Sequence, residues 1–153
     1  MKKFNVLITI ALILMQCKNQ DVIKLKNRTL FNVDKGGLGV IFEPDYMMIE
    51  DIGKIDNIRF YIGKEECIGW MPTIDQVVTA NKMIKKTGLL LGEKIYDYQY
   101  LGFIEDEEYF IYVICIVNLR DIEVIPIMCD DCEDEYFTFI YDVKTNQIKE
   151  VVN

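Results

Sequence analysis

Hydrophobic positions are most continuous between residues 109 and 119, where eleven residues contain no charge, no Gly and no Pro. β-Branched and aromatic residues dominate this stretch, which is typical of a strand. Because both alternating sets of positions are apolar, we expect the strand to lie in the middle of a sheet with both faces covered. Residues 109–119 are therefore the predicted centre of the fold.

A different pattern, with apolar residues every three to four positions, predicts a helix over residues 73–87. Thr73 and Gln76 fit a capping box, and Gly88 is placed to end the helix. We expect the apolar stripe of this helix to lie across the sheet. Asn81 lies within the stripe, where we expect its side chain to form a hydrogen bond to a loop rather than to act in a site.

Alternating patterns after the helix predict further strands at residues 94–104, 122–128, 136–143 and 148–152. Acidic or polar turns separate them, so the C-terminal half is expected to form an antiparallel meander. Before the helix only short strands are predicted, at 40–42, 46–49 and 57–62, and Trp70 is interpreted as a packing residue. The predicted fold class is α+β, with one main helix packed on a curved antiparallel sheet of four to five strands.

The N-terminus has the parts of a secretion signal. Lys2 and Lys3 precede an apolar run, Val6 to Met15, which is too short for a bilayer span of roughly 20 residues. The ending Leu-Met-Gln-Cys at residues 14–17 resembles the lipobox of bacterial lipoproteins, which implies cleavage before Cys17 and lipidation of its thiol. The predicted organisation is a signal peptide over 1–17, a polar tether over 18–28 and one domain over 29–153.

Residues 70–153 resemble a group of small bacterial envelope lipoproteins. The resemblance lies in the capped helix opening with Pro-Thr, the YxYLGFI strand, an acidic hairpin, the YFTFIYD strand and a terminal Lys-Thr-Asn turn. It implies a cystatin-like fold, in which a helix packs on a curved antiparallel sheet. It implies no activity and no catalytic residue.

Composition excludes several chemistries. The chain contains no His and no Ser, so a Ser-His-Asp triad, a Cys-His pair and a HExxH zinc site are absent. After Cys17, 15 Lys and Arg stand against 25 Asp and Glu, a net charge of −10. This charge repels phosphate backbones, so nucleic acid is not an expected partner, whereas a basic partner would be attracted. We predict no cofactor and no metal.

Two stretches carry candidate site residues. The acidic loop 129–135 contains Cys129 and Cys132, which we interpret as part of a structural disulfide, with a calcium site and a redox C-x-x-C as less favoured alternatives. Either thiol is also a candidate partner of Cys67, whereas Cys115 is expected to be a small buried hydrophobe. A row of tyrosines, Tyr96, Tyr98 and Tyr100, is either a binding surface or ordinary cross-strand packing.

The predicted function is that of an exported protein, anchored by lipid in the bacterial envelope on the periplasmic side or in the outer membrane. It would be a non-catalytic protein-binding module of the inhibitor or immunity type. One alternative is an envelope enzyme that uses thiols or carboxylates. The other is a structural lipoprotein that associates with itself.

Overall fold

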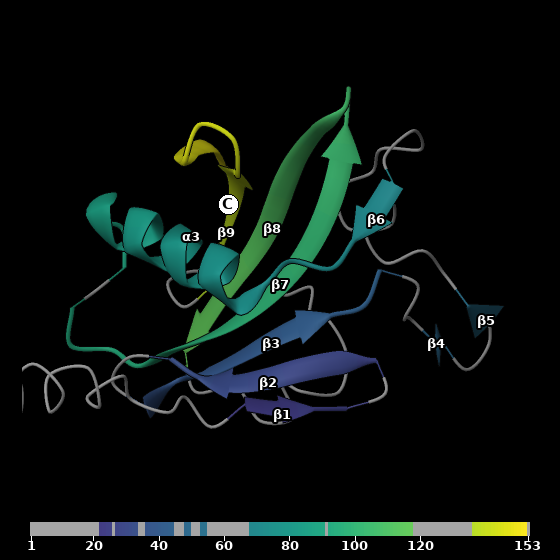
Figure 1. Cartoon of the computed structure of the whole chain (residues 1–153). Coiled ribbons are helices and arrows are strands. Elements are labelled where there is room, and N and C mark those ends of the chain that lie inside the picture. Colours follow the sequence, from purple (N-terminus) through teal and green to yellow (C-terminus); the bar gives the residue numbers. More distant parts are fainter. Residues whose placement is uncertain are drawn as a thin grey trace, which may run out of the picture.

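The computed structural model describes residues 22–25, 27–33, 36–44, 48–49, 53–54, 68–90, 92–117 and 136–152. The elements are β1 (Val22–Lys24), β2 (Arg28–Asn32), β3 (Leu38–Phe42), β4 (Met48–Ile49), β5 (Gly53–Lys54), β6 (Ile68–Trp70), α3 (Ile74–Lys86), β7 (Tyr96–Glu105), β8 (Glu108–Val117), β9 (Tyr136–Asp142) and β10 (Gln147–Val152). Figure 1 shows one large twisted sheet with α3 across one of its faces.

Within these ranges, eight strands form the main sheet. Its main path runs β1-β2-β3-β7-β8-β9-β10, and β6 pairs with β7. One edge of β7 pairs with β8 along its whole length, from Tyr96 to Glu105. The other edge is shared, since β3 pairs in parallel with residues 98–100 and β6 pairs antiparallel with residues 102–104. The longest hairpin among the described residues, β7–β8, thus joins the N-terminal strands to the C-terminal strands.

The predicted fold class is wrong in both the size and the pairing of the sheet. We expected four to five antiparallel strands under one main helix, whereas the sheet has eight strands, includes a parallel pair, and carries a helix of only 13 residues. The described chain is closer to an all-β protein than to a cystatin-like one. The reason is that β1, β2, β3 and β6 join the same sheet as the C-terminal strands, although they come from the part of the sequence with the weakest patterns.

The predicted central strand is confirmed over the described residues. β8 lies between β7 and β9, and its side chains are buried on both faces of the sheet. On the helix side, Ile111 and Val113 belong to the main core, together with Val77, Ala80 and Ile84 of α3. On the opposite side, Tyr112 and Ile114 pack with Leu101 and Phe103.

The predicted helix is also confirmed. α3 begins after Thr73, whose hydroxyl accepts a hydrogen bond from the Gln76 amide, while the Gln76 side chain accepts from the Thr73 amide at 2.8 Å. Asn81 is buried in the helix stripe as expected, but its side chain donates to the Tyr100 hydroxyl of β7 and not to a loop. No helix in the described ranges combines the length and the apolar character that crossing a bilayer requires.

Two other predictions change. The predicted tether, 18–28, contains β1, which pairs with β2 and so belongs to the domain. The predicted meander placed a strand at residues 122–128 between the strands at 109–119 and 136–143. In the structure these two strands, β8 and β9, pair directly with each other, from Phe110 to Ile116 on β8. Residues 122–128 and 57–62 themselves lie outside the described residues.

Candidate functional site

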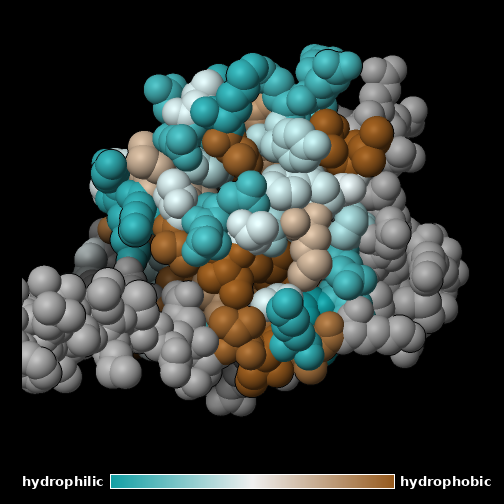
Figure 2. Space-filling model, in the orientation of Figure 1, coloured by the Kyte–Doolittle hydropathy of each residue, from teal (hydrophilic) through white to brown (hydrophobic). Residues whose placement is uncertain are grey.

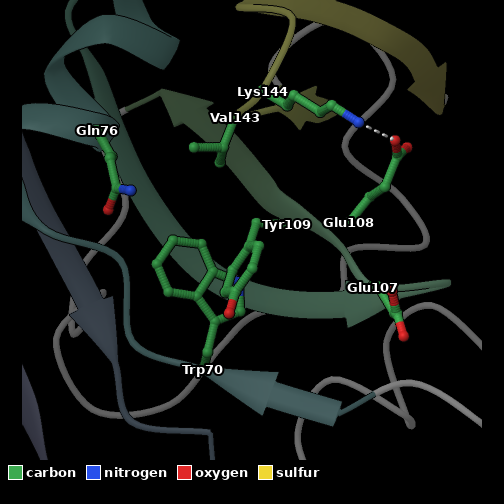
Figure 3. A pocket seen from close by; sticks show the side chains of 7 residues that line it. All are labelled: Trp70, Gln76, Glu107, Glu108, Tyr109, Val143 and Lys144. Carbon is green, nitrogen blue, oxygen red and sulfur yellow. Dashed lines mark hydrogen bonds and ion pairs between the residues drawn. The ribbon is translucent and has the colours of Figure 1, made fainter.

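A cleft of about 370 Å³ lies beside the tip of the β7–β8 hairpin. Three segments that are distant in the sequence form it: the end of β6 with the start of α3, the hairpin tip, and the turn between β9 and β10 (Figure 3). The lining residues are Trp70, Gln76, Glu107, Glu108, Tyr109, Val143 and Lys144. The cleft therefore exists only once the sheet has assembled.

An aromatic pair forms one side of the cleft. The rings of Trp70 and Tyr109 meet edge to face, with centroids 5.1 Å apart and planes at 87°. The indole Nε1–H of Trp70 donates to the carbonyl oxygens of Phe103 at 3.1 Å and Phe110 at 3.2 Å, which fixes the ring across the hairpin. Tyr109 remains 47% exposed. A fixed aromatic pair with one exposed ring is a surface on which a ligand can pack.

The acidic rim comes from an unusual turn. Asp106 and Glu107 join the paired residues Glu105 and Glu108, and both have a positive φ, of 51° and 64°. Two-residue hairpin turns of this kind favour Asn, Asp or Gly at the first position and Gly at the second, so Asp106 suits its position whereas Glu107 is strained. The chain thus keeps Glu107 at a position where the backbone favours Gly, and strain of this kind points to a role for its side chain.

The turn sequence yields a stability prediction. Replacing Glu107 by Gly is expected to raise the free energy of unfolding by about 1 kcal/mol, because Gly adopts the positive φ without strain. Urea unfolding followed by circular dichroism measures the difference. The matched control is Glu93→Gly, at an exposed acid outside the helix and strands and without a positive φ. A Glu107→Gly protein no more stable than this control would contradict the strain argument.

The wall of the cleft that is formed by the turn between β9 and β10 depends on a buried carboxylate, that of Asp142. Asp142 Oδ1 accepts from the backbone amides of Lys144 at 2.8 Å and Thr145 at 2.9 Å, and Oδ2 lies 3.2 Å from Lys149 Nζ. Burial alone would raise the pKa of Asp142, but these hydrogen bonds outweigh it and lower the pKa from 3.8 to about 2. Asp142 therefore holds the turn that presents Lys144 to the cleft.

The charged groups of the cleft do not form a catalytic pair. Glu108 turns towards Lys144, with which it forms an ion pair at 3.0 Å, whereas Glu107 points away from it (Figure 3). General acid–base catalysis by two carboxylates requires both to face one scissile bond from its two sides. The arrangement is instead suited to binding, with an apolar aromatic side and a negatively charged rim.

The described part of the chain also constrains thiol chemistry. Cys115 is fully buried in the core as a small hydrophobe, as predicted, and burial raises the pKa of its thiol well above the ordinary value. A neutral, buried thiol is not a nucleophile. Cys17, Cys67, Cys129 and Cys132 lie outside the described residues, so the predicted lipidation and disulfide remain predictions.

The tyrosine row lies in the core. Tyr96, Tyr98 and Tyr100 are 5%, 3% and 0% exposed, in the cluster that also contains the helix residues. Tyr98 and Tyr100 stack with centroids 6.2 Å apart. Burial also raises the pKa of Tyr100 well above its usual value. The packing interpretation therefore fits these residues, and a binding surface does not.

Sequence reasoning did not identify the cleft. Trp70 does pack against the core, as expected, but it also lines the cleft, and Tyr109 was assigned only to the central strand. The signal that was present is local: four consecutive acids that span a two-residue hairpin turn, followed directly by an aromatic residue near the end of a strand. Comparison of the chain with known protein families, with curated proteins and with solved structures found no match.

Proposed function

We propose that this chain is an exported, lipid-anchored binding protein that is not catalytic and that holds a basic segment of a partner protein in the Trp70–Tyr109 cleft. The observation that carries the proposal is the aromatic pair of Trp70 and the exposed Tyr109 beside the acidic hairpin tip. The proposed export and anchor rest on the N-terminal sequence and on the lipobox-like ending at Cys17.

A Lys or Arg side chain matches the cleft in two ways. Its aliphatic part packs on the aromatic rings, and its cationic end is attracted by the faces of Trp and Tyr. The carboxylate of Glu107 points away from the Glu108–Lys144 ion pair and is exposed at the rim, where it adds a second attraction. The net charge of −10 after Cys17 attracts a basic partner from a distance.

This arrangement fits an inhibitor or immunity protein better than an enzyme. Such a protein needs a rigid surface and a partner of complementary charge, and the Trp70 hydrogen bonds and the Asp142 turn supply the rigidity. The enzyme alternative would require two carboxylates that converge, or an exposed thiolate, and the cleft offers neither.

Binding is expected to depend on Tyr109. Trp70 is the only Trp of the chain, so its fluorescence reports directly on the cleft. Titration with short arginine-containing peptides is expected to change this fluorescence, and Tyr109→Ala is expected to weaken binding about tenfold because it removes one of the two rings. The same peptides with citrulline in place of arginine keep the shape without the charge, and should bind more weakly.

The control for this experiment is Ile95→Ala. Ile95 is 44% exposed, similar to Tyr109, but it precedes β7 at the end of that strand opposite the hairpin tip. The Ile95→Ala protein should bind the peptides as the unchanged protein does. If Tyr109→Ala and Ile95→Ala behave alike, or if citrulline peptides bind as tightly as arginine peptides, the cleft does not recognise a basic segment.

A further inference from the structure

We propose that the free edge of β1 lies against the surface of the lipid bilayer, so that the sheet is oriented on the membrane as well as tethered to it. β1 is the end strand of the sheet path and pairs only with β2 among the described strands. β1 and the residue after it carry apolar side chains in contact with solvent on both faces of this outermost strand: Val22 is 39% exposed, Ile23 56% and Leu25 42%. Figure 2 shows hydrophobic surface at the lower rim of the molecule, where Figure 1 places β1.

The first argument is distance, and it rests on the lipid anchor of the proposed function. Only four residues separate Cys17 from Val22. Even a fully extended chain would therefore hold β1 within about 17 Å of an acylated Cys17. A strand so close to the headgroups, with exposed apolar side chains, gains by burying them in the interface.

The second argument is charge. Residues 18–28 contain four Lys and Arg and one Asp, whereas residues 29–153 contain 11 Lys and Arg and 24 Asp and Glu. Within β1, Lys24 is exposed beside the apolar residues. A basic segment is attracted by anionic headgroups and the acidic remainder is repelled by them. The charge distribution thus turns β1 towards the membrane and the hairpin tip with its cleft away from it.

A second copy of the chain is the other candidate for this edge, because an unpaired strand can pair with another strand. Pairing would use the backbone groups of β1 but gives no role to the charge difference between residues 18–28 and the rest of the chain. The membrane accounts for the apolar residues, the basic residues and the short distance between Cys17 and β1 together, so it is the occupant that the observations favour.

The test uses the full chain produced in a host that processes lipoproteins, purified from its membranes and reconstituted into vesicles. Ile23→Trp adds an indole at the β1 edge, and Ile68→Trp is the control, since Ile68 is 61% exposed on β6. Each is compared with the unchanged protein, whose single Trp gives the background. Vesicles of phosphatidylcholine with phosphatidylglycerol carry brominated acyl chains, which quench indoles at the interface.

The added indole of Ile23→Trp is expected to lose about half of its emission on these vesicles, because interfacial residues reach the depth of the acyl boundary. Ile68→Trp should lose none. Adding Lys24→Glu, or omitting phosphatidylglycerol, should reduce the quenching of Ile23→Trp.

The outcomes separate the two proposals. If the protein floats with the vesicles and carries an acylated Cys17 by mass spectrometry, but Ile23→Trp is not quenched, the anchor stands and the docking of β1 is wrong. If Cys17 carries no acyl group, the anchor and the distance argument both fail, and the docking proposal is overturned. If chemical crosslinking instead joins two chains through β1, and brominated lipid has no effect, the edge binds a second copy.

Discussion

Replacing Gly102 by Ala is expected to lower the free energy of unfolding by about 3 kcal/mol. Gly102 lies opposite Trp70 in the β6–β7 pairing. A Cβ atom there would lie 2.4 Å from the Trp70 carbonyl oxygen, 2.8 Å from Trp70 Nε1 and 2.9 Å from Pro72 Cδ. The first contact is with a backbone atom, and the second is with an indole ring that two hydrogen bonds hold in place. Neither group can move away alone, so β6 itself must move.

Urea unfolding followed by circular dichroism measures this loss, and the fluorescence of Trp70 reports whether the cleft side of the molecule changes with it. Gly92→Ala is the matched control, because a Cβ at Gly92 meets no atom within 4 Å. The control should be close to neutral. If the two proteins unfold within about 0.5 kcal/mol of each other, β6 adjusts freely and Trp70 is not fixed as described.

Several elements of this fold could be predicted because their signals are local. The helix carries a capping box, a dipole-matched charge pattern and one apolar stripe, and it formed where these features placed it. β7 and β8 are long alternating or fully apolar runs, and a two-residue turn leaves little freedom in how they pair. For such elements the sequence within about ten residues contains most of the information.

The size of the sheet could not be predicted because it depends on pairing between distant segments. β1 has the sequence Val-Ile-Lys within a polar segment, and nothing in it distinguishes an edge strand from a tether. The parallel pairing of β3 with β7 joins residues about sixty positions apart. The Phe31 ring of β2 lies over Gly39 of β3 and stacks on the Tyr100 ring of β7. The pairing of β3 with β7 is therefore favourable only after these core side chains have come together.

The cleft was missed for the same reason. Trp70, Tyr109 and Lys144 each have an ordinary local explanation, as a packing residue, a strand residue and a turn residue. They come together because β6 pairs with β7 and because the Val143 amide donates to the Tyr109 carbonyl oxygen at 3.0 Å. Sites built from several turns at one end of a sheet become visible only when the register of the strands is known.

The second large effect is expected at Asp142, whose side chain is 1% exposed although it is the last residue of β9, directly before a surface turn. Its pKa falls from 3.8 to about 2 in the folded protein. The charged form is therefore favoured by folding, and this contributes about 2 kcal/mol of stability above pH 3.8. The contribution is lost as the pH falls through the folded pKa of about 2, below which the carboxylate is protonated in both the folded and the unfolded state.

Asp142→Asn should therefore lower the free energy of unfolding by about 2 kcal/mol at neutral pH, because a neutral amide accepts weaker hydrogen bonds from Thr145 and Lys144 than a carboxylate does and cannot attract Lys149. The gap between the two proteins should close as the pH falls from about 4 to about 2, which urea unfolding at a series of pH values measures. Asp75→Asn, at an exposed residue of the first turn of α3, is the control for loss of a carboxylate and should change stability by less than about 0.5 kcal/mol. A difference in stability that stays constant down to pH 2 would mean that the shape of the Asp142 side chain, and not its charge, is stabilising. The wall of the cleft that carries Lys144 would then not depend on the ionisation of Asp142.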